Sequence, residues 1–440
     1  MEKENVKTER AMYNFFTMGA ENNSIPDKIC AFLLAILPLL QHYIGLYKNA
    51  GFTVLLLVFP FLAYRMVRRI VEKKLPNKKC VLAILPLLLY ELYVLIRAAS
   101  LSRVLYAGFM LFLFACVAYE CVNVRSFFRC ALLIAKIASL LIILQTILFN
   151  LFGYHLRLIP TDLLLDGSEM WLNRAITGLK AEGEMYRPSG IFLEPSHLFL
   201  YVLPLLSMLI LLPGFNPRRR EEAILLSAGL LLSTSGLGII VVVFLWALFW
   251  TLFQDNDAGK MNFKNFFTVR TGRIIICGIL LVLICCSIVP IVDEAVGRFL
   301  PNANGYNSAI DGRTERAESF LMQESNYPEE TSEEVNRIFG VGESFREINF
   351  NMAGFHATLY KFGFIGLILT YWFYGQGLFT LKAPYNVLSL IIIGVSYFSA
   401  HTHGTFYMLF YVLFLMNGHY HKQQLPVPSG DKNHEIEQVE

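Results

Sequence analysis

A succession of long apolar runs constrains this chain more than any other feature. A helix needs about 20 consecutive apolar residues to cross a lipid bilayer. Runs near that length lie at about 29–47, 51–67, 80–96, 104–121, 130–152 and 190–213. Further runs, some of them shorter, lie at about 222–235, 237–253, 273–292, 353–379, 385–400 and 404–420. We therefore expect an all-α polytopic membrane protein with about 12 transmembrane helices.

The composition agrees with this expectation and excludes several classes of function. Hydrophobic residues make up 55% of the 440 residues and charged residues only 16%, which is too apolar for a soluble chain of this length. No basic domain or recognition module indicates nucleic-acid binding. The eight cysteines form no C-x-x-C motif, so neither a disulfide framework nor a thiolate zinc site is predicted. The absence of a G-x-x-x-x-G-K-[ST] loop argues against an ATP-driven pump.

The positions of Lys and Arg predict the orientation, because cytoplasmic connections carry an excess of these residues. Two short connections are strongly basic: one includes Arg68–Arg69 and Lys78–Lys79, and the other contains Arg218–Arg220. Placing both in the cytoplasm puts the N-terminal segment 1–28 and the polar tail 421–440 there as well. The residues between these two segments, 29–420, then form the transmembrane domain.

Two long loops, at about 153–189 and 293–352, face outward in this orientation. Within the second, Thr314–Met322 has apolar residues at helical spacing, so we expect a large and partly helical extracytoplasmic loop. Loops of such length are usually functional or disordered, and the aromatic and apolar residues of this one favour an ordered cap. The paired runs 222–253 and 385–420 also fit one re-entrant unit each, without changing the sides of the loops.

The stretch Arg187–His197 brings ionisable side chains to the start of an apolar run. Such groups at bilayer depth are costly and tend to mark function. Pro195 favours a helix that begins next to Glu194, and Glu194 and His197 share a face of that helix. Glu194 is a candidate general base at the outer bilayer edge. Equally, it fits a helix cap paired to Arg187.

Two arginines of the second outer loop, Arg313 and Arg316, are also three residues apart. Arginine holds phosphate through a planar fork and keeps its charge, so two on one helical face would suit a diphosphate. Taken alone, the pattern fits local pairing with neighbouring carboxylates, such as Asp311, Glu315 and Glu318, somewhat better.

Several histidines and buried charges have two interpretations. His356 begins the run at 353–379 and fits a base, a proton shuttle, a hydroxyl anchor or a structural residue. His401 and His403 form H-x-H without an evident third ligand, so no metal site is predicted. The charges within or at the ends of the spans, Glu91, Arg97 and Lys136, fit mutual pairing, or a polar path in a transporter, and His42 shares that ambiguity.

Four stretches of the chain resemble the bacterial O-antigen and capsular-polysaccharide polymerases of the O-antigen ligase-like superfamily. Arg187–His197 looks like their Arg…Glu-Pro segment that enters a span, and Leu232–Gly238 is similar to their Ser/Gly break between two spans. The third similar piece is Gly312–Arg313, which lies in the large outer loop. Ile338–Gly366, which contains His356, is similar to their G-x-G…H…G-x-x-G run.

This sequence departs from the family pattern at two positions. Gly236 stands where an arginine often follows the serine of the break, and Ala357 stands where an asparagine is common after the histidine. Both departures fit a different substrate or a more distant relative.

The resemblance implies a GT-C-like membrane enzyme that carries out metal-independent, inverting glycosyl transfer without a cofactor. The donor would be a growing glycan on a polyprenyl diphosphate, and the acceptor a hydroxyl of the next lipid-linked repeat unit. Arg187, Arg313 and Arg316 would neutralise the leaving diphosphate. Glu194 would deprotonate the acceptor hydroxyl, and His356 would assist or replace it. The neighbouring Ser196 and His197 are further substrate-binding candidates.

The implied product is O-antigen, capsule or exopolysaccharide, made at the outer face of the bacterial cytoplasmic membrane. Polyprenyl-diphosphate-linked glycans and the lipid bilayer would be the partners, with a flippase and a chain-length regulator beside them. Two alternatives stay open. One is a ligase of the same superfamily, which transfers glycan to another acceptor. The other is a non-enzymatic transporter of lipid-linked sugars, with a polar path through Glu91 and Lys136.

Overall fold

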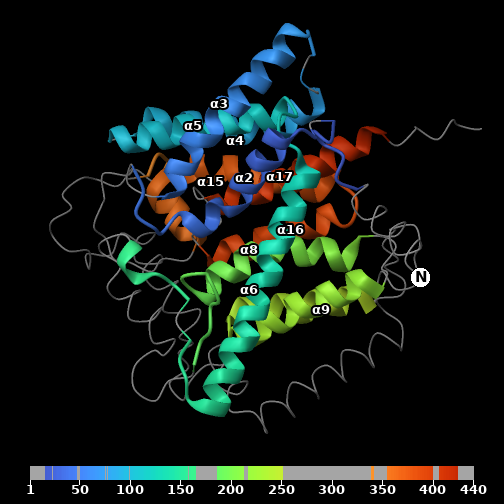
Figure 1. The fold of residues 1–440 in the computed structure, drawn as a ribbon. Helices are drawn as coiled ribbons and strands as arrows, with labels where there is room; N and C mark the ends of the chain where they lie inside the picture. The colour runs from blue at the N-terminus through green and yellow to red at the C-terminus, as the bar shows by residue number, and fades with distance from the viewer. Residues whose placement is uncertain are drawn as a thin grey trace, which may run out of the picture.

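The computed structural model describes a large part of the chain. These residues are 15–21, 23–46, 50–74, 76, 78–98, 100–156, 158–164, 186–212, 217–250, 338–340, 354–399 and 406–424. Within them the structure is helical and contains no β-sheet, apart from one isolated bridge between Tyr43 and Leu164. Figure 1 shows the helices packed side by side in one bundle.

The first helices are α2 (Ile25–Leu40), α3 (Ala50–Val71), α4 (Lys78–Ile96), α5 (Leu101–Ala118) and α6 (Val124–Phe152). A short 3₁₀ turn, η1 (Thr161–Leu163), precedes α8 (Pro195–Leu211), α9 (Pro217–Leu232) and α10 (Gly236–Leu248). The last are α15 (Gly354–Thr380), α16 (Tyr385–Phe398) and α17 (Phe406–Gln424). Each predicted apolar run except 273–292, which lies outside the described residues, coincides with one of these helices.

The lengths and surfaces of these helices indicate a membrane-embedded protein. Five of the described helices, α3, α4, α5, α6 and α15, are long and apolar enough to cross a bilayer, while α8, α10 and α16 are apolar but shorter. Large apolar side chains such as Leu57, Leu133 and Ile368 are exposed on the outer surfaces of the bundle. Contiguous apolar surface is unfavourable in water and ordinary in lipid. The exact number of spans stays a prediction.

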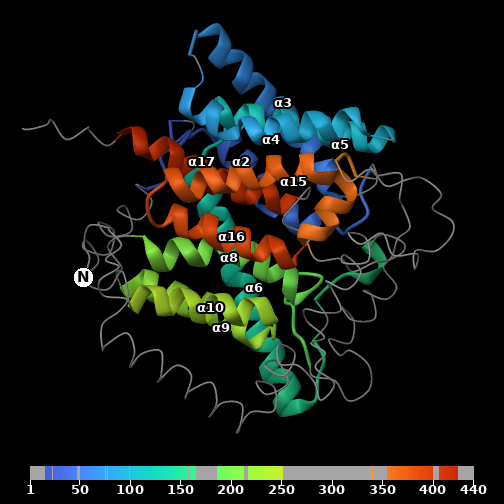
Figure 2. The same cartoon turned by 180° about the vertical axis from the view of Figure 1, so that it is seen from behind.

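Helix α8 lies inside the bundle, and every residue from His197 to Leu211 is buried. It packs against α6, α9, α10, α16 and α17, and Figure 2 shows it between α16 and the α9–α10 pair. Its sequence is apolar all round, which suits a helix with neighbours on every side. The Tyr411 hydroxyl of α17 donates to the Leu200 carbonyl at 3.0 Å. The N-terminal end of α8 lies beside the turn that follows α2 and beside the start of α17.

Two charged side chains within the bundle contact groups that the sequence did not indicate. Lys136 of α6 forms an ion pair with Glu222 of α9 at 2.9 Å. Arg97 donates to the Gly340 carbonyl at 3.0 Å. Mutual pairing of Glu91, Arg97 and Lys136 was one of the predictions, and it is wrong for Lys136 and Arg97. Lys136 lies on α6, which packs against α9, and Arg97 follows α4, whose end contacts the segment 338–340.

Two glycines that are distant in sequence meet beside α4. Gly363 breaks the helical geometry of α15, with φ 64° and ψ −167°, and Gly340 has φ 68°. A Cβ at Gly363 would overlap the Ile338 carbonyl oxygen, and a Cβ at Gly340 would lie 2.6 Å from the Gly363 nitrogen. The Ile365 amide donates to that same Ile338 carbonyl at 3.3 Å. The backbones approach closely only because both residues lack a side chain.

Candidate functional site

The segment that leads into α8 is held against the last turns of α6. Tyr186 stacks on Phe149 with ring centroids 4.2 Å apart. The Gly190 amide donates to the Gln145 side-chain oxygen at 3.0 Å, and Gly190 has φ +63°. A Cβ there would lie 3.0 Å from the Ala138 carbonyl oxygen, so glycine allows this close approach. Arg187 lies within the segment so positioned.

Glu194 is the N-cap residue of α8, and Pro195 is the first residue of the helix, as the sequence predicts. The Glu194 backbone is extended, with φ −142°, and its carboxylate makes no capping hydrogen bond. Instead, the Ser196 hydroxyl donates to Oε2 of Glu194 at 3.0 Å. The side chain is therefore not used to cap the helix, which was one of the two interpretations of the sequence. Pairing with Arg187 stays a prediction.

His197 brings residues from the ends of two other helices to this place. Its ring stacks on that of His42, which follows the end of α2, with centroids 4.5 Å apart and planes 8° from parallel. The ring of Tyr407, at the start of α17, lies 6.1 Å away on centroids. Tyr407 is close enough to Glu194 to interact with its charge, and its hydroxyl lies beside the Gln41 side chain. A polar cluster of Glu194, Ser196, His197, His42 and Tyr407 results.

A small apolar cluster flanks this polar cluster. Tyr43 and Leu193, the chain neighbours of His42 and Glu194, pack with Ile159 and Leu164 of the segment 158–164. The Ile44 amide donates to the Leu163 carbonyl at 2.7 Å, next to the bridge between Tyr43 and Leu164. These contacts fix the turn after α2 to the segment 158–164. They therefore hold His42 and Glu194, the chain neighbours of Tyr43 and Leu193, in place.

The break between α9 and α10 lies near the same end of α8. Ser233, Thr234 and Ser235 are buried there, and Thr234 has φ 57°. A Cβ at Gly238 would lie 3.6 Å from the Phe199 ring. The small residues that the sequence places in this break thus pack close to the first turns of α8, as close packing requires.

His356 has a different set of neighbours. It lies buried in the first turn of α15, with its ring 5.2 Å from that of Phe355 and 5.7 Å from that of Tyr397 on centroids. Gly354 packs against the last carbonyls of α16, at Ser396 and Ser399. The described contacts connect His356 to an aromatic cluster rather than to Glu194 or His197.

The remaining predicted residues are not placed. Arg313 and Arg316 lie outside the described residues, as do His401 and His403. Within the described ranges, no group of three His, Cys, Asp or Glu side chains could hold a metal ion.

Sequence reasoning missed Tyr407 and Gln41 and left the role of His42 undecided. A tyrosine in an apolar helix gives no signal of function, because tyrosines are common near bilayer interfaces. The stacking of His42 on His197 is a contact between parts of the chain that are distant in sequence. His42 and Tyr407 are identified only from their ring contacts with His197 in the folded bundle.

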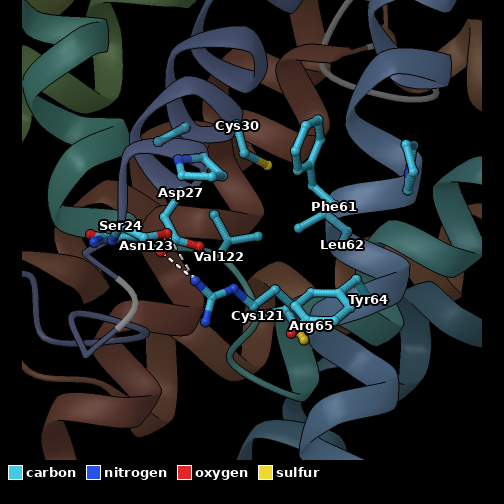
Figure 3. Close-up of a pocket in the computed structure, with 13 residues that line it drawn as sticks. Ser24, Asp27, Cys30, Phe61, Leu62, Tyr64, Arg65, Cys121, Val122 and Asn123 are labelled. Atoms are coloured by element: carbon cyan, nitrogen blue, oxygen red, sulfur yellow. Dashed lines mark hydrogen bonds and ion pairs between the residues drawn. The ribbon is translucent and has the colours of Figure 1, made fainter.

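A cavity of about 380 Å³ lies elsewhere in the bundle (Figure 3). Three parts of the chain enclose it, namely the first turns of α2, the helix α3 and the turn from α5 to α6. It is lined at one side by Ser24 and Asp27 in the first turn of α2, whereas His42 follows the other end of that helix. This cavity is therefore distinct from the polar cluster at Glu194.

Comparison with known proteins gives no further assignment: no protein-family model, no curated protein and no solved structure matches this chain.

Proposed function

We propose that this chain polymerises polyprenyl-diphosphate-linked oligosaccharide repeat units at the outer face of a bacterial cytoplasmic membrane. The single observation that supports it most is the place of Glu194. It is a carboxylate at the end of a helix that is buried along its length, it makes no capping hydrogen bond, and it accepts a hydrogen bond from Ser196 and lies near His197. Carboxylates so positioned act as general bases when a neighbouring donor fixes their orientation.

The reaction would be one inverting displacement. The acceptor hydroxyl attacks the anomeric carbon of the donor, and a new glycosidic bond forms as the bond from that carbon to the diphosphate oxygen breaks. Glu194 takes the hydroxyl proton, and the diphosphate leaves with the bonding electron pair. Arg187, Arg313 and Arg316 neutralise the charge that develops on it. The family resemblance supplies the identity of the substrates and the roles of the three arginines.

His197 and His42 extend the polar surface next to the carboxylate. Ser196 donates to one oxygen of Glu194 and so fixes the orientation of the carboxylate beside which the acceptor hydroxyl would bind. His356 keeps its proposed role as an assisting residue, although its described neighbours are aromatic. In the polar cluster His197 and Tyr407 are buried, while Glu194, Ser196 and His42 are half-buried. A half-buried polar cluster suits a sugar hydroxyl that arrives from the surface, because electrostatic interactions strengthen as bound substrate excludes water.

A transporter of lipid-linked sugars is the main alternative from another class. It needs a polar path through the membrane, and Lys136 was a candidate for that path. Lys136 instead forms an ion pair with Glu222, and Arg97 donates to a backbone carbonyl. These contacts do not join Lys136 or Arg97 to Glu91 in a polar path, which favours the enzyme over the transporter.

A complementation experiment in a gene-deletion strain tests the proposal. The strain is complemented with wild-type protein, with Glu194→Gln, or with Glu72→Gln as a matched control. Glu72 follows the C-terminal end of α3, where it pairs with Arg68, and it has no proposed role. We expect long surface glycan with wild type and control, and single repeat units with Glu194→Gln at equal protein levels. Long glycan with Glu194→Gln would refute the proposal.

The deletion strain itself separates the alternatives. Loss of a polymerase leaves single repeat units at the cell surface, which supports the proposal. Loss of a transporter leaves almost no surface glycan. Loss of a ligase leaves glycan of full length that is not attached to its acceptor. The gel of surface glycan therefore distinguishes all three.

A further inference from the structure

The cavity between α2 and α3 combines apolar walls with one charged wall. Its volume is about 380 Å³, large enough for part of a small amphiphile. The apolar lining comes chiefly from Ala31, Pro60, Phe61 and Leu62. Figure 3 shows Asp27 and Arg65 facing each other at one side of this space.

The charged wall consists of residues that hydrogen-bond to one another. Arg65 forms an ion pair with Asp27 and donates to the Ser24 hydroxyl at 3.2 Å. Asp27 also accepts from the Ser24 amide at 2.8 Å, and its side chain is 6% exposed. Asn123, whose side chain caps α6, is a further buried polar residue of the lining. Asp27 and Ser24 thus fix the guanidinium of Arg65 at the edge of the cavity.

Two residues that line the cavity lie on the exposed surface of α3, a helix long and apolar enough to cross a bilayer. Phe61 and Tyr64 line the cavity and are also exposed on the surface of the bundle, 42% and 65% respectively. Leu57 and Val67 are exposed on the same helix. A molecule in the bilayer can therefore reach the cavity sideways, without passing through water.

The charged wall lies at the basic end of α3. Cations outnumber carboxylates in this region: Arg65, Arg68, Arg69, Lys73, Lys74, Lys78, Lys79, Arg125 and Arg129 stand against Glu21, Asp27, Glu72 and Glu120. Such a surplus attracts anionic lipid head groups. The apolar part of the cavity extends from this end toward the middle of α2 and α3, which is the direction of an acyl chain.

We propose that this cavity binds an anionic phospholipid. The phosphate accepts hydrogen bonds from the Arg65 guanidinium, whose planar fork matches phosphate geometry, and one acyl chain lies against Ala31, Pro60 and Phe61. Asp27 acts as a positioning residue for Arg65. In the orientation proposed above, the lipid belongs to the cytoplasmic leaflet. The site is remote from Glu194 and does not depend on the proposed function.

Native mass spectrometry of the full chain, purified and delipidated in detergent, tests this site. The protein is titrated with phosphatidylglycerol, with diacylglycerol, or with glycerol 3-phosphate. We expect saturable binding of phosphatidylglycerol and much weaker binding of the other two. Arg65→Gln weakens phosphatidylglycerol binding about tenfold or more, since hydrogen bonds to charged groups contribute that much. Arg68→Gln is the matched control and retains binding, because Arg68 is an exposed residue paired with Glu72.

A second variant keeps the test decisive where the loss of Arg65 impairs folding. Ala31→Leu fills the apolar part of the cavity and leaves the ion pair in place, and we expect it to weaken phosphatidylglycerol binding as well. Wild-type affinity in both variants would overturn the proposal. Binding of diacylglycerol as tight as that of phosphatidylglycerol would show that the phosphate is not recognised, and it would overturn the proposal. Equal binding of glycerol 3-phosphate would replace the lipid by a soluble phosphate and overturn it too.

Discussion

His42 and His197 stack with nearly parallel rings, at a centroid distance of 4.5 Å. One residue follows α2 and the other belongs to the first turn of α8, so the stack joins two helices at the end of the bundle that carries Glu194. The first prediction follows from this relationship.

Replacing His42 separates packing from polar chemistry. His42→Phe keeps an aromatic ring against His197, and we expect normal folding. His42→Ala removes the ring and lowers the free energy of unfolding by about 1 kcal/mol or more, as the loss of an aromatic pair does. Thermal unfolding in detergent measures the stability, and the length of surface glycan measures the activity. Equal melting temperatures of the two variants would show that the stack is not stabilising.

Ser196 is expected to orient Glu194 through its hydroxyl. Ser196→Ala removes the hydrogen bond to Oε2 and should slow polymer formation about threefold to tenfold, the effect of one hydrogen bond of about 1 kcal/mol. Ser196→Thr retains the hydroxyl and should restore the rate. The measurement is the rate of glycan elongation in membranes with equal amounts of each variant. A threonine variant as slow as the alanine variant would contradict the assignment.

Gly363 and Gly375 offer a matched pair in one helix. Gly363→Ala places a Cβ into the Ile338 carbonyl at a positive φ, whereas a Cβ at Gly375 meets nothing within 4 Å. We expect Gly363→Ala to destabilise the protein by about 1–3 kcal/mol or more, and Gly375→Ala to stabilise it by up to about 1 kcal/mol. Thermal melting in detergent gives both values. Equal melting temperatures would contradict the close approach of Gly340 and Gly363.

The ion pair of Lys136 and Glu222 is expected to be structural. Replacing either partner alone, as in Lys136→Met or Glu222→Leu, leaves a buried charge and lowers stability, by about 1–3 kcal/mol after allowance for partial exposure of Lys136. The double variant should recover most of that loss. A double-mutant cycle of melting temperatures tests this. If the double variant melts normally but abolishes glycan synthesis, the pair has a functional role.

Glu120 provides a pH-dependent prediction outside the membrane-spanning helices. Burial raises the pKa of this carboxyl, while the Arg69 charge opposes the rise. Since the folded-state pKa lies above the unfolded one, ionisation of Glu120 costs stability above the folded pKa, and this cost is absent below the unfolded pKa. Glu120→Gln should therefore raise the melting temperature near neutral pH, and the gain should vanish in acid. A gain that grows toward low pH would contradict the sign.

The positions of the helices could be predicted because each apolar run is a local property of the sequence. Pro195 likewise marked the start of α8, since proline favours the first turn of a helix. The exact ends moved by a few residues, as for the run at 130–152, which begins at Val124 in the structure because Asn123 caps it.

The candidate site could be predicted only in part. Glu194, Ser196 and His197 are neighbours in sequence, so their proximity follows from the helix itself. The contacts of Tyr407 with this group and of Lys136 with Glu222 depend on which helices pack together, and apolar composition says little about that choice. In a membrane, helices select neighbours by close packing and a few polar contacts, which the pattern of apolar residues does not encode.

The enclosure of α8 also sets the order in which the protein can mature. Tyr407 and its helix α17 are synthesised after every other described element, and α17 covers α8 on one side. Until α17 has been made and inserted, one flank of α8 faces lipid and the polar cluster lacks a member. A ribosome-bound chain that stops before α17 is therefore expected to hold its other helices in the membrane without the complete cluster of Glu194, Ser196, His197, His42 and Tyr407.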